Sequence, residues 1–197
     1  MEVTRPDQPH HTYGEYLTWP DDPRQEPTDG ALYVSEPPAP APIHQMLVSE
    51  LCQQIGAALK DSLYRIYVAP FDVWLPKSDQ AGEVSGTVMQ PDLFILRDCG
   101  RIDRRGLRGA PDWVAEVLSP GTARYDQIVK LATYEHAGVG EVWLVDPAKQ
   151  TLAIYRLEEG RYGAPVIQAL KGQTPIAAVP GMSVDWNRLL RRIPSID

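Results

Sequence analysis

The sequence has few cysteines and no apolar segment of membrane-spanning length. Its two cysteines, Cys52 and Cys99, show no metal-ligand spacing, so a cysteine-bound metal is not predicted. Two thiols without a recognisable signal peptide favour reduced cysteines and a cytoplasmic location. No apolar run approaches the roughly 20 residues that a transmembrane helix needs. We therefore expect no membrane partner.

Positive charge is also scarce. Lysine and arginine number 19 against 26 aspartates and glutamates, which gives a formal net charge of -7. A nucleic-acid-binding domain is usually basic, but only a local patch must be positive, and metal-binding carboxylates count as negative until they are loaded. The segment 97–109 predicts such a patch, with a solvated loop as the alternative. Its candidate nucleic-acid-binding residues are Arg101, Arg104, Arg105 and Arg108.

The length of 197 residues is enough for one domain with a substantial core. The hydrophobic fraction of 43% is that of a soluble globular protein. The 19 prolines crowd the first third and the tail, where we expect loops and short strands. We predict a flexible N-terminus over residues 1–11 and a single domain over 12–197, without internal repeats.

Hydrophobic periodicity predicts two long helices, at 43–60 and 122–137, the second ending at Gly138 as a C′ glycine. A short helix is expected at 11–20. Pro91 removes a ladder hydrogen bond, so an edge, a bulge or a bend is expected there. The predicted strands lie near 31–35, 63–70, 71–76, 87–96, 112–118, 141–146 and 151–157.

A carboxylate stands in the middle of one apolar strand. The segment 111–120, PDWVAEVLSP, is typical of a buried strand, and it carries Glu116. Burying a carboxylate is unfavourable unless it is paired, hydrogen-bonded or bound to a metal. The upstream strand-like segment 91–98 carries Asp92, and the downstream helix carries Lys130. Two carboxylates on neighbouring strands with a nearby lysine are typical of a metal-dependent phosphodiesterase.

Asp92 and Glu116 are the predicted metal ligands. Mg²⁺ prefers oxygen ligands and keeps several of its waters, so two carboxylates and a phosphate oxygen suit it. Mn²⁺ is the alternative ion. The metal would polarise the scissile phosphate and lower the pKa of an attacking water. The structural alternative is that the two carboxylates cap strand ends or pair with arginines.

Further side chains are candidates for the same site, each with a structural alternative. Glu26 could act as an outer ligand or flank a turn. His44, at a helix start, could approach the site or cap the helix. Asp112 shares a strand face with Glu116 and could shape the site or end a loop. The fourth candidate is Tyr134.

The second helix aligns three of its polar residues. Asp126, Lys130 and Tyr134 follow at intervals of four and share one helix face. The structural alternative is a surface ion pair between Asp126 and Lys130 beside a buried Tyr134.

The order of these motifs resembles the PD-(D/E)XK nuclease superfamily and, within it, the Uma-two family. The resemblance implies an α/β fold with a restriction-endonuclease-like core, in which helices flank a central, mixed and twisted sheet. It also implies Asp92, Glu116 and Lys130 as catalytic residues. The matching segments are EPTDG (26–30), IHQ (43–45), PDLFIL (91–96), PDWVAEVLSP (111–120), YDQIVKLATYEHAGVGEVWLVDP (125–147) and IYRLEEGRY (154–162).

One departure from the superfamily concerns its lysine. Where the motif has Glu-X-Lys, this chain has Glu116-Val117-Leu118. In families of this kind a lysine from the following helix takes that place, which the resemblance assigns here to Lys130. Lysine has a long flexible stem, so a helix can deliver its ammonium to a site on a strand.

The leading hypothesis is a Mg²⁺-dependent endonuclease acting on DNA, most simply duplex DNA. A homodimer is expected, because cutting both strands needs two sites and twofold symmetry matches that of the duplex. The second hypothesis is a catalytically inactive nucleic-acid-binding or regulatory module on the same fold. The third is a structural or toxin-like interaction protein. Convergence of Asp92, Glu116 and Lys130 in space discriminates between them, whereas DNA against RNA, sequence specificity and methylation dependence stay open.

Overall fold

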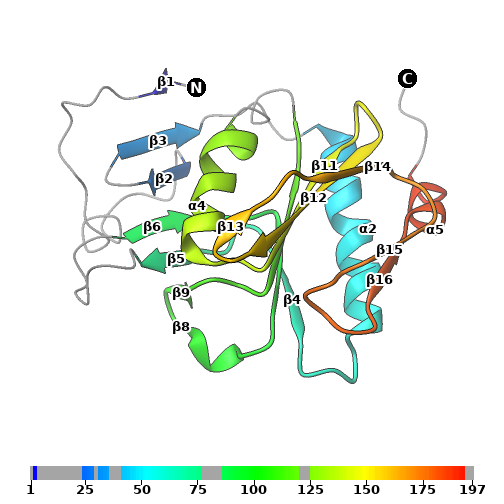
Figure 1. Cartoon of the computed structure of the whole chain (residues 1–197), viewed down its shortest axis with the longest axis horizontal. Coiled ribbons are helices and arrows are strands. Elements are labelled where there is room, and N and C mark those ends of the chain that lie inside the picture. The colour runs from blue at the N-terminus through cyan, green and yellow to red at the C-terminus, as the bar shows by residue number, and fades with distance from the viewer. Residues whose placement is uncertain are drawn as a thin grey trace.

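The fold is built on a seven-stranded sheet (Figure 1). A computed structural model describes residues 2–3, 24–28, 31–35, 41–76, 86–119 and 125–193, with side chains over 41–75, 87–119 and 125–193. The strand order is β13-β12-β11-β10-β7-β4, and β14 also pairs with β12. The strands are β4 (Arg65–Val68), β7 (Leu93–Leu96), β10 (Trp113–Val117), β11 (Glu141–Asp146), β12 (Thr151–Glu158), β13 (Arg161–Tyr162) and β14 (Val166–Ala169).

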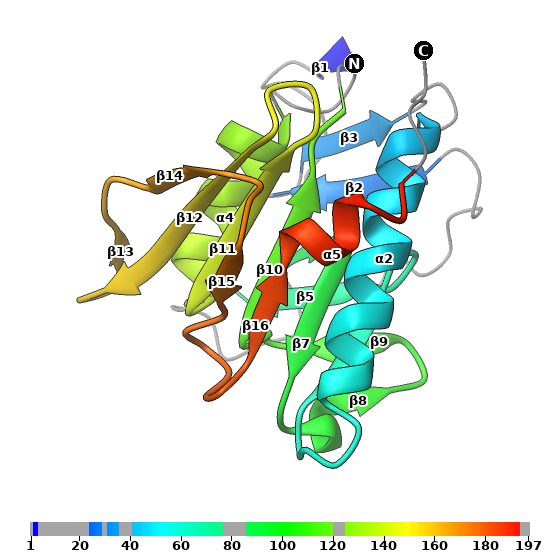
Figure 2. The ribbon, with the colours of Figure 1, turned by 90° about the vertical axis from the view of Figure 1, so that its right-hand side faces the viewer.

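The sheet is mixed. Strands β10 and β11 are parallel, whereas β10 pairs with β7, and β11 with β12, in antiparallel fashion. Parallel neighbours need a crossover, and the helix α4 (Leu131–Ala137) lies in the chain between them. Helices α2 (Pro42–Ala58) and α5 (Trp186–Leu190) cover one face of the sheet, and α4 lies on the other (Figure 2). The α/β fold with helices flanking a central mixed sheet is thus confirmed.

Three smaller sheets surround the central one. A four-stranded sheet has the order β6-β5-β9-β8, a three-stranded sheet the order β1-β3-β2, and β15 pairs with β16. Their bounds, with the 3-10 turn η1, are β1 (Glu2–Val3), β2 (Arg24–Thr28), β3 (Ala31–Ser35), β5 (Val73–Pro76), β6 (Gly86–Met89), η1 (Cys99–Arg101), β8 (Ile102–Asp103), β9 (Gly106–Arg108), β15 (Gln173–Pro175) and β16 (Ser183–Asp185).

Strand β10 lies at the centre of the core, and each of its residues is buried. Because side chains alternate along a strand, Trp113, Ala115 and Val117 pack into the cluster formed with α2 and α5. Val114 packs into the other cluster, which includes Tyr134 of α4. Glu116 has the parity of Val114 and therefore faces the α4 side of the sheet, among apolar groups.

Helix α2 follows the predicted apolar periodicity closely. The prediction was 43–60 and the helix spans Pro42–Ala58, with Pro42 in the first turn, where a missing N–H leaves no hydrogen bond unmade. Leu47, Leu51 and Ile55 are buried at intervals of four. Their packing against the sheet fixes the angle of the helix and so the position of its first turn.

The single strand predicted over 87–96 is wrong. Residues 86–89 form β6 and 93–96 form β7, and these two strands belong to different sheets. Pro91 lies between them and cannot donate to a ladder, so the chain bends there and passes from one sheet to the next. This bend places Asp92 directly before the first residue of β7.

The second long helix is only partly a standard α-helix. Asp126–Lys130 form a π-helical turn, η2, which continues directly into α4. The helix ends as predicted at Gly138, whose φ of 84° lies in the left-handed region that favours glycine. The helix predicted at 11–20 lies outside the described residues. Of the N-terminal stretch 1–11, the structure describes β1, which pairs with β3.

Within the described part of the chain, no helix combines the length and the apolar character required to cross a bilayer.

Candidate active site

The register of the central sheet places Asp92 beside Glu116. Leu93 of β7 pairs with Ala115 of β10 in antiparallel fashion, so the residues flanking this pair are neighbours. The Asp92 N–H donates to Glu116 Oε2 at 3.3 Å, and the Val117 N–H donates to Asp92 Oδ2 at 2.8 Å. Hydrogen bonds from backbone N–H groups to side-chain carboxylates thus fix the relative positions of Asp92 and Glu116, which are 24 positions apart in the chain.

Glu116 is almost completely enclosed, with 1% of its surface exposed. Both of its carboxylate oxygens have partners. The Tyr134 hydroxyl donates to Oε1 at 2.6 Å, and the Lys130 ammonium lies 3.1 Å from Oε1 and 3.2 Å from Oε2. Helix α4 and the π-turn before it thus supply the two partners that make this buried carboxylate tolerable.

The Lys130 ammonium points into the sheet and not to solvent, with 7% of the side chain exposed. Besides Glu116, its Nζ lies 3.5 Å from Asp126 Oδ1 and donates to the Gln90 carbonyl oxygen at 3.3 Å. It also lies 6.0 Å from the centre of the Tyr125 ring. The relocated lysine of the sequence prediction therefore lies within salt-bridge distance of Glu116.

The buried polar side chains of η2 and α4 follow one another at intervals of four. Asp126 and Lys130 are both buried in η2, and four residues later Tyr134 is buried in α4. Residues at this spacing share one face of a helix, so all three are directed toward the sheet.

His44 joins the cluster from the first turn of α2. Its Nε2 lies 3.1 Å from Asp92 Oδ2, and 12% of the histidine side chain is exposed. Asp92 Oδ2 thus has two partners, the imidazole and the Val117 N–H. The start of helix α2 therefore helps to fix the orientation of the Asp92 carboxylate.

The cluster holds more negative than positive charge. Glu116 and Asp126 pair with the Lys130 ammonium. Asp92 joins them through its N–H, which donates to Glu116, while its carboxylate contacts His44 and the Val117 N–H. Burial raises the pKa of Glu116 to about 8, against the attraction of Lys130 and with the help of the neighbouring negative charges. Burial also opposes ionisation of Asp92, but the His44 hydrogen bond and the Lys130 charge hold its pKa below the ordinary value.

These shifts predict an unusual pH dependence of stability in the metal-free protein. Glu116 has an ordinary pKa of 4.5 and a folded-state pKa of about 8, so the folded state holds its proton more tightly. Between these two values stability must fall as pH rises, by at most about 1.4 kcal/mol per pH unit for one proton. Asp92 has the opposite effect on stability. Because its folded-state pKa is lowered, the stability that it contributes is lost only as pH falls below its ordinary pKa of 3.8. Thermal melts in EDTA across this range measure the slope.

The Glu116→Gln variant provides the control for this prediction, because its amide cannot titrate. Its melting temperature should lack the downward slope that the wild-type protein shows. Glu141 of β11 is a matched second control, since it is equally buried and hydrogen-bonded to the Trp143 indole at 2.6 Å. Glu141→Gln should retain the slope. An identical slope in the wild type and in Glu116→Gln would contradict the assignment.

The donor atoms of the cluster fit a hard divalent cation. Carboxylate oxygens are the ligands of Mg²⁺ and Mn²⁺, and Mg²⁺ is commonly held by one or two carboxylates, with waters and substrate phosphates completing its shell. Over the described ranges, no three His, Cys, Asp or Glu side chains are placed to enclose an ion by themselves. Asp92 and Glu116 thus suit an open site that also takes a substrate oxygen.

Asp112 lies outside this cluster. Its Oδ2 accepts from the Arg97 N–H at 2.8 Å, which ties down the chain just before β10, four positions from Glu116. The structural alternative of the sequence analysis, ending the loop, is the one observed. Glu26 falls in β2, whose side chains lie outside the described residues.

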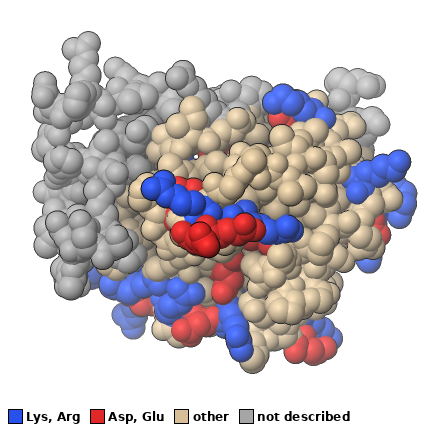
Figure 3. Space-filling model, viewed as in Figure 1, with Lys and Arg blue, Asp and Glu red and all other residues tan. Residues whose placement is uncertain are grey.

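The predicted arginine patch lies at the other end of the strands. Asp92 precedes β7, whereas the arginines follow it, on η1, in the turn between β8 and β9, and on β9, far from the first turn of α2 in Figure 2. Arg101 donates to the Ala110 carbonyl at 2.8 Å, and Arg108 pairs with Asp103 at 2.8 Å and lies over the Trp74 ring. Arg104 and Arg105 are exposed. In the view of Figure 3, positive side chains gather at the lower left, where Figure 1 draws β8 and β9, with acidic side chains beside them.

Two members of the cluster were not candidates from the sequence. Asp126 was interpreted as half of a surface ion pair, yet 4% of its surface is exposed. The spacing of four residues between Asp126 and Lys130 predicted that they form an ion pair, but it could not show that the pair is buried. Gln90 contributes a backbone carbonyl, which every residue has, so no sequence signal could have indicated it.

Tyr134 offers a test of how the cluster is held. Tyr134→Phe removes the 2.6 Å hydrogen bond to Glu116 but keeps the ring that packs in the core. Outer partners of metal ligands typically contribute 10- to 100-fold to affinity or activity, so we expect a loss of about that size. Titration of Mn²⁺ by calorimetry measures it. Tyr155→Phe, on β12, is the control, and equal affinities for both variants would contradict a supporting role.

The sheet, the crossover helix and the acidic cluster together define a restriction-endonuclease-like protein. The chain matches the family model Uma2, described as "Putative restriction endonuclease", over residues 13–187, and it belongs to that family. It is also similar to a crystal structure of a "putative nuclease belonging to DUF820" from Anabaena variabilis, with 21% identity and a TM-score of 0.70. That match covers 92% of this chain and 98% of the other. No match was found among curated proteins.

Proposed function

We propose that this protein is a metal-dependent nuclease that hydrolyses phosphodiester bonds in DNA, with Asp92, Glu116 and Lys130 as its catalytic residues. One observation carries the proposal. Asp92 just before β7, Glu116 on β10 and Lys130 on η2, far apart in the sequence, meet in one acidic cluster. The Asp92 N–H donates to the Glu116 carboxylate, which also pairs with the Lys130 ammonium. Structural ion pairs balance their charges, whereas this cluster retains excess negative charge that a divalent cation would neutralise.

Asp92 and Glu116 would hold the ion, which would supply a Lewis acid and an activated water. The protein's own contribution is to keep the two carboxylates in place. Asp92 is fixed by the Val117 N–H and by His44, and Glu116 is fixed by Tyr134. Ligands held in this way need little rearrangement when they bind a cation.

Lys130 is suited to stabilise charge on the phosphate. An ammonium has three N–H donors, and here they face Glu116, Asp126 and the Gln90 carbonyl. Of these acceptors, Glu116 is the one that would turn toward a cation. The donor released from Glu116 is then available to a phosphate oxygen or to the attacking water, where positive charge lowers the barrier.

The competing hypothesis is a module that keeps the fold and has no catalysis. If the side chains of Asp92, Glu116 and Lys130 pointed away from one another, the structure would favour this non-catalytic module. The contacts of Lys130 with Glu116 support the enzyme instead. We propose a cytoplasmic location, which the two free thiols, Cys52 and Cys99, support.

The test of the proposed function is direct. The purified protein is incubated with supercoiled plasmid and with single-stranded DNA, in Mg²⁺, in Mn²⁺ and in EDTA. We expect cleavage with either metal and none with EDTA. Binding to DNA without any cleavage in either metal would instead support the inactive module.

A homodimer remains our prediction for the assembly, because two strands of a duplex require two sites. Light scattering at micromolar concentration, with and without DNA, measures it. A monomer under both conditions would contradict the prediction, and the enzyme would then cut one strand at a time.

A further inference from the structure

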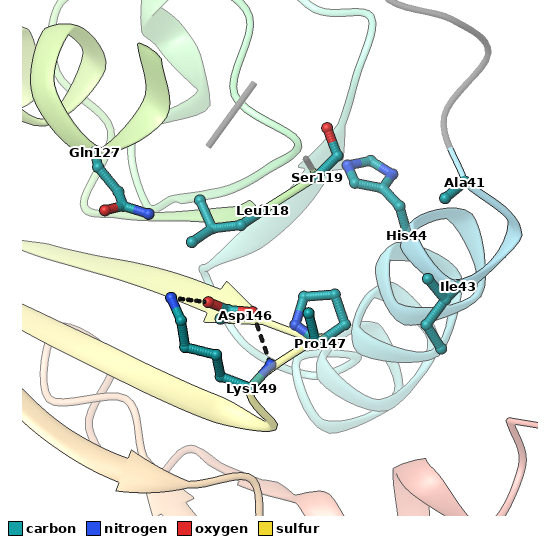
Figure 4. A pocket seen from close by; sticks show the side chains of 10 residues that line it. Ala41, Ile43, His44, Leu118, Ser119, Gln127, Asp146, Pro147 and Lys149 are labelled. Carbon is teal, nitrogen blue, oxygen red and sulfur yellow. Dashed lines mark hydrogen bonds and ion pairs between the residues drawn. The ribbon is translucent and has the colours of Figure 1, made fainter. Parts of the chain in front are cut away.

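A cavity of about 320 Å³ opens beside the acidic cluster (Figure 4). It lies where the parallel strands β10 and β11 end and where α2 begins. Its position follows from the topology, because parallel strands direct their carboxyl ends to the same edge of a sheet. The lining residues used in the argument below are Ile43, His44, Leu118, Gln127, Ala148 and Lys149.

The cavity adjoins the cluster at His44. His44 lines the cavity and also contacts Asp92 Oδ2 at 3.1 Å. Leu118, on its wall, is two residues after Glu116 and projects from the same strand face. A phosphate bound at the two carboxylates would therefore have the cavity as its immediate neighbour.

The walls of the cavity are largely apolar, and its polar groups are few. Ile43, Leu118 and Pro147 contribute aliphatic surface, and the Gln127 amide points toward the space in Figure 4. The Asp146 carboxylate accepts from the Lys149 N–H at 3.0 Å and from its ammonium at 2.9 Å. Its negative charge is thus balanced, so the rim does not repel a polyanion.

We propose that this cavity receives an unstacked nucleobase from the nucleotide that flanks the scissile phosphate. The inference rests on the proposed nuclease function and narrows its substrate class to DNA with an unpaired nucleotide at the cut. A volume at the lower end of the range for ligand pockets suits a single small planar group. Apolar walls replace the stacking that the base loses, and the Gln127 amide can hydrogen-bond the base edge.

The same geometry disfavours a fully paired duplex. A base within a duplex is stacked on both sides and must be extruded before it can enter, at an expense of a few kcal/mol. A single-stranded or mismatched nucleotide avoids most of that penalty. The exposed Lys149 ammonium at the rim can meet a backbone phosphate of the same strand. We therefore expect unpaired DNA to be cut faster than the paired duplex favoured by the sequence analysis.

The experiment uses the full chain and two sets of short single-stranded oligonucleotides. In one set a single abasic residue is moved along the strand, and the cut positions and rates are measured in Mg²⁺. In the other set 2-aminopurine replaces one base, and its fluorescence is measured in EDTA, without cleavage. The lining includes no Phe, Tyr or Trp side chain, and the His44 imidazole is its single aromatic ring, so fluorescence should rise when the base next to the cut leaves its stacked neighbours and enters.

One abasic position should slow cleavage by about 5- to 150-fold, corresponding to the roughly 1–3 kcal/mol that a bidentate contact from an amide to a base edge contributes. Ala148→Trp places a bulky ring at the mouth and should cause a similar loss and abolish the fluorescence change. Ala57→Trp, at an exposed position of α2 away from the cavity, is the matched control and should behave as wild type. Circular dichroism and thermal melts verify that both variants fold.

Two other outcomes are distinguishable. A protein that cuts every oligonucleotide equally, with no effect of the abasic position or of Ala148→Trp, overturns the base-binding cavity and leaves the nuclease proposal intact. A protein that neither binds nor cuts any of these DNAs overturns the proposed function, and the cavity proposal falls with it.

Discussion

Asp92→Asn or Glu116→Gln is expected to abolish metal-dependent cleavage while leaving the fold intact. Each substitution removes a charge and a strong metal ligand but preserves volume. Loss of a residue that merely supports a ligand typically reduces metal affinity or activity 10- to 100-fold, so loss of the ligand itself should exceed about 100-fold. The measurements are plasmid cleavage in Mg²⁺ and calorimetric titration with Mn²⁺.

Stability should respond differently from activity. Because burial raises the pKa of Glu116 to about 8, this side chain is largely protonated at neutral pH without metal. Glutamine resembles that neutral form and can still accept from Lys130 through its amide oxygen. We therefore expect equal melting temperatures at about pH 4.5 and a melting temperature of Glu116→Gln that exceeds that of wild type by a growing margin as pH rises toward 8 in EDTA, because only the wild-type unfolded state gains stability by releasing the Glu116 proton.

Glu141→Gln is the matched control for the loss of a buried carboxylate. Glu141 has the same exposure as Glu116 and lies on the adjacent strand, but it accepts from the Trp143 indole and the Ala178 N–H. This variant can lower stability, yet it should cut DNA at the wild-type rate. Wild-type cleavage by both Asp92→Asn and Glu116→Gln would show that the proposed site is wrong.

The second large effect is expected at Lys130. Lys130→Met keeps the aliphatic stem and removes the ammonium that faces Glu116. Metal binding should persist, because both oxygen ligands remain and a competing cation is gone. The rate of cleavage should fall by roughly 10²–10³-fold, the loss seen when one donor to developing charge is removed. Single-turnover cleavage at saturating Mg²⁺ separates this loss from any change in binding.

Melting experiments add an independent readout for Lys130. Without its ammonium, Glu116 and Asp126 lose the cation that pairs with both of them. The stabilisation by Mg²⁺ should therefore be larger for Lys130→Met than for wild type. Lys171→Met, at an exposed position, is the control and should change neither activity nor melting.

A rescue experiment tests the relocated lysine more closely. Leu118 occupies the position where the superfamily motif has its lysine, and it lies on the same strand face as Glu116. Leu118→Lys added to Lys130→Met should restore part of the activity. Full activity of Lys130→Met alone would contradict a catalytic role and would favour the non-catalytic module.

Elements with a strong local pattern were predicted well. The periodic apolar residues of α2 and the mostly apolar runs of β10 and β11 each fix an element over its own length. The division of 87–96 into two strands was not predicted, because membership of a sheet depends on distant partners. The π-turn was missed as well, since a residue pattern spaced by four is compatible with either kind of helix.

The sequence by itself determined which chemical groups are available. It placed Glu116 in an apolar strand, Asp92 behind a proline and Lys130 on a helix, and each is a local property that residue types reveal. It also determined that Glu116 needs a partner, because a buried carboxylate without one is too unfavourable to persist.

Only the tertiary structure decided which groups meet. The antiparallel register of β7 and β10 set Asp92 beside Glu116, and the crossover packed Lys130 and Asp126 onto the same sheet face. The same packing put the arginines at the opposite end of the strands. Pairing across a sheet joins residues with no contact along the chain, so its register follows from how the whole core packs, which no short segment specifies.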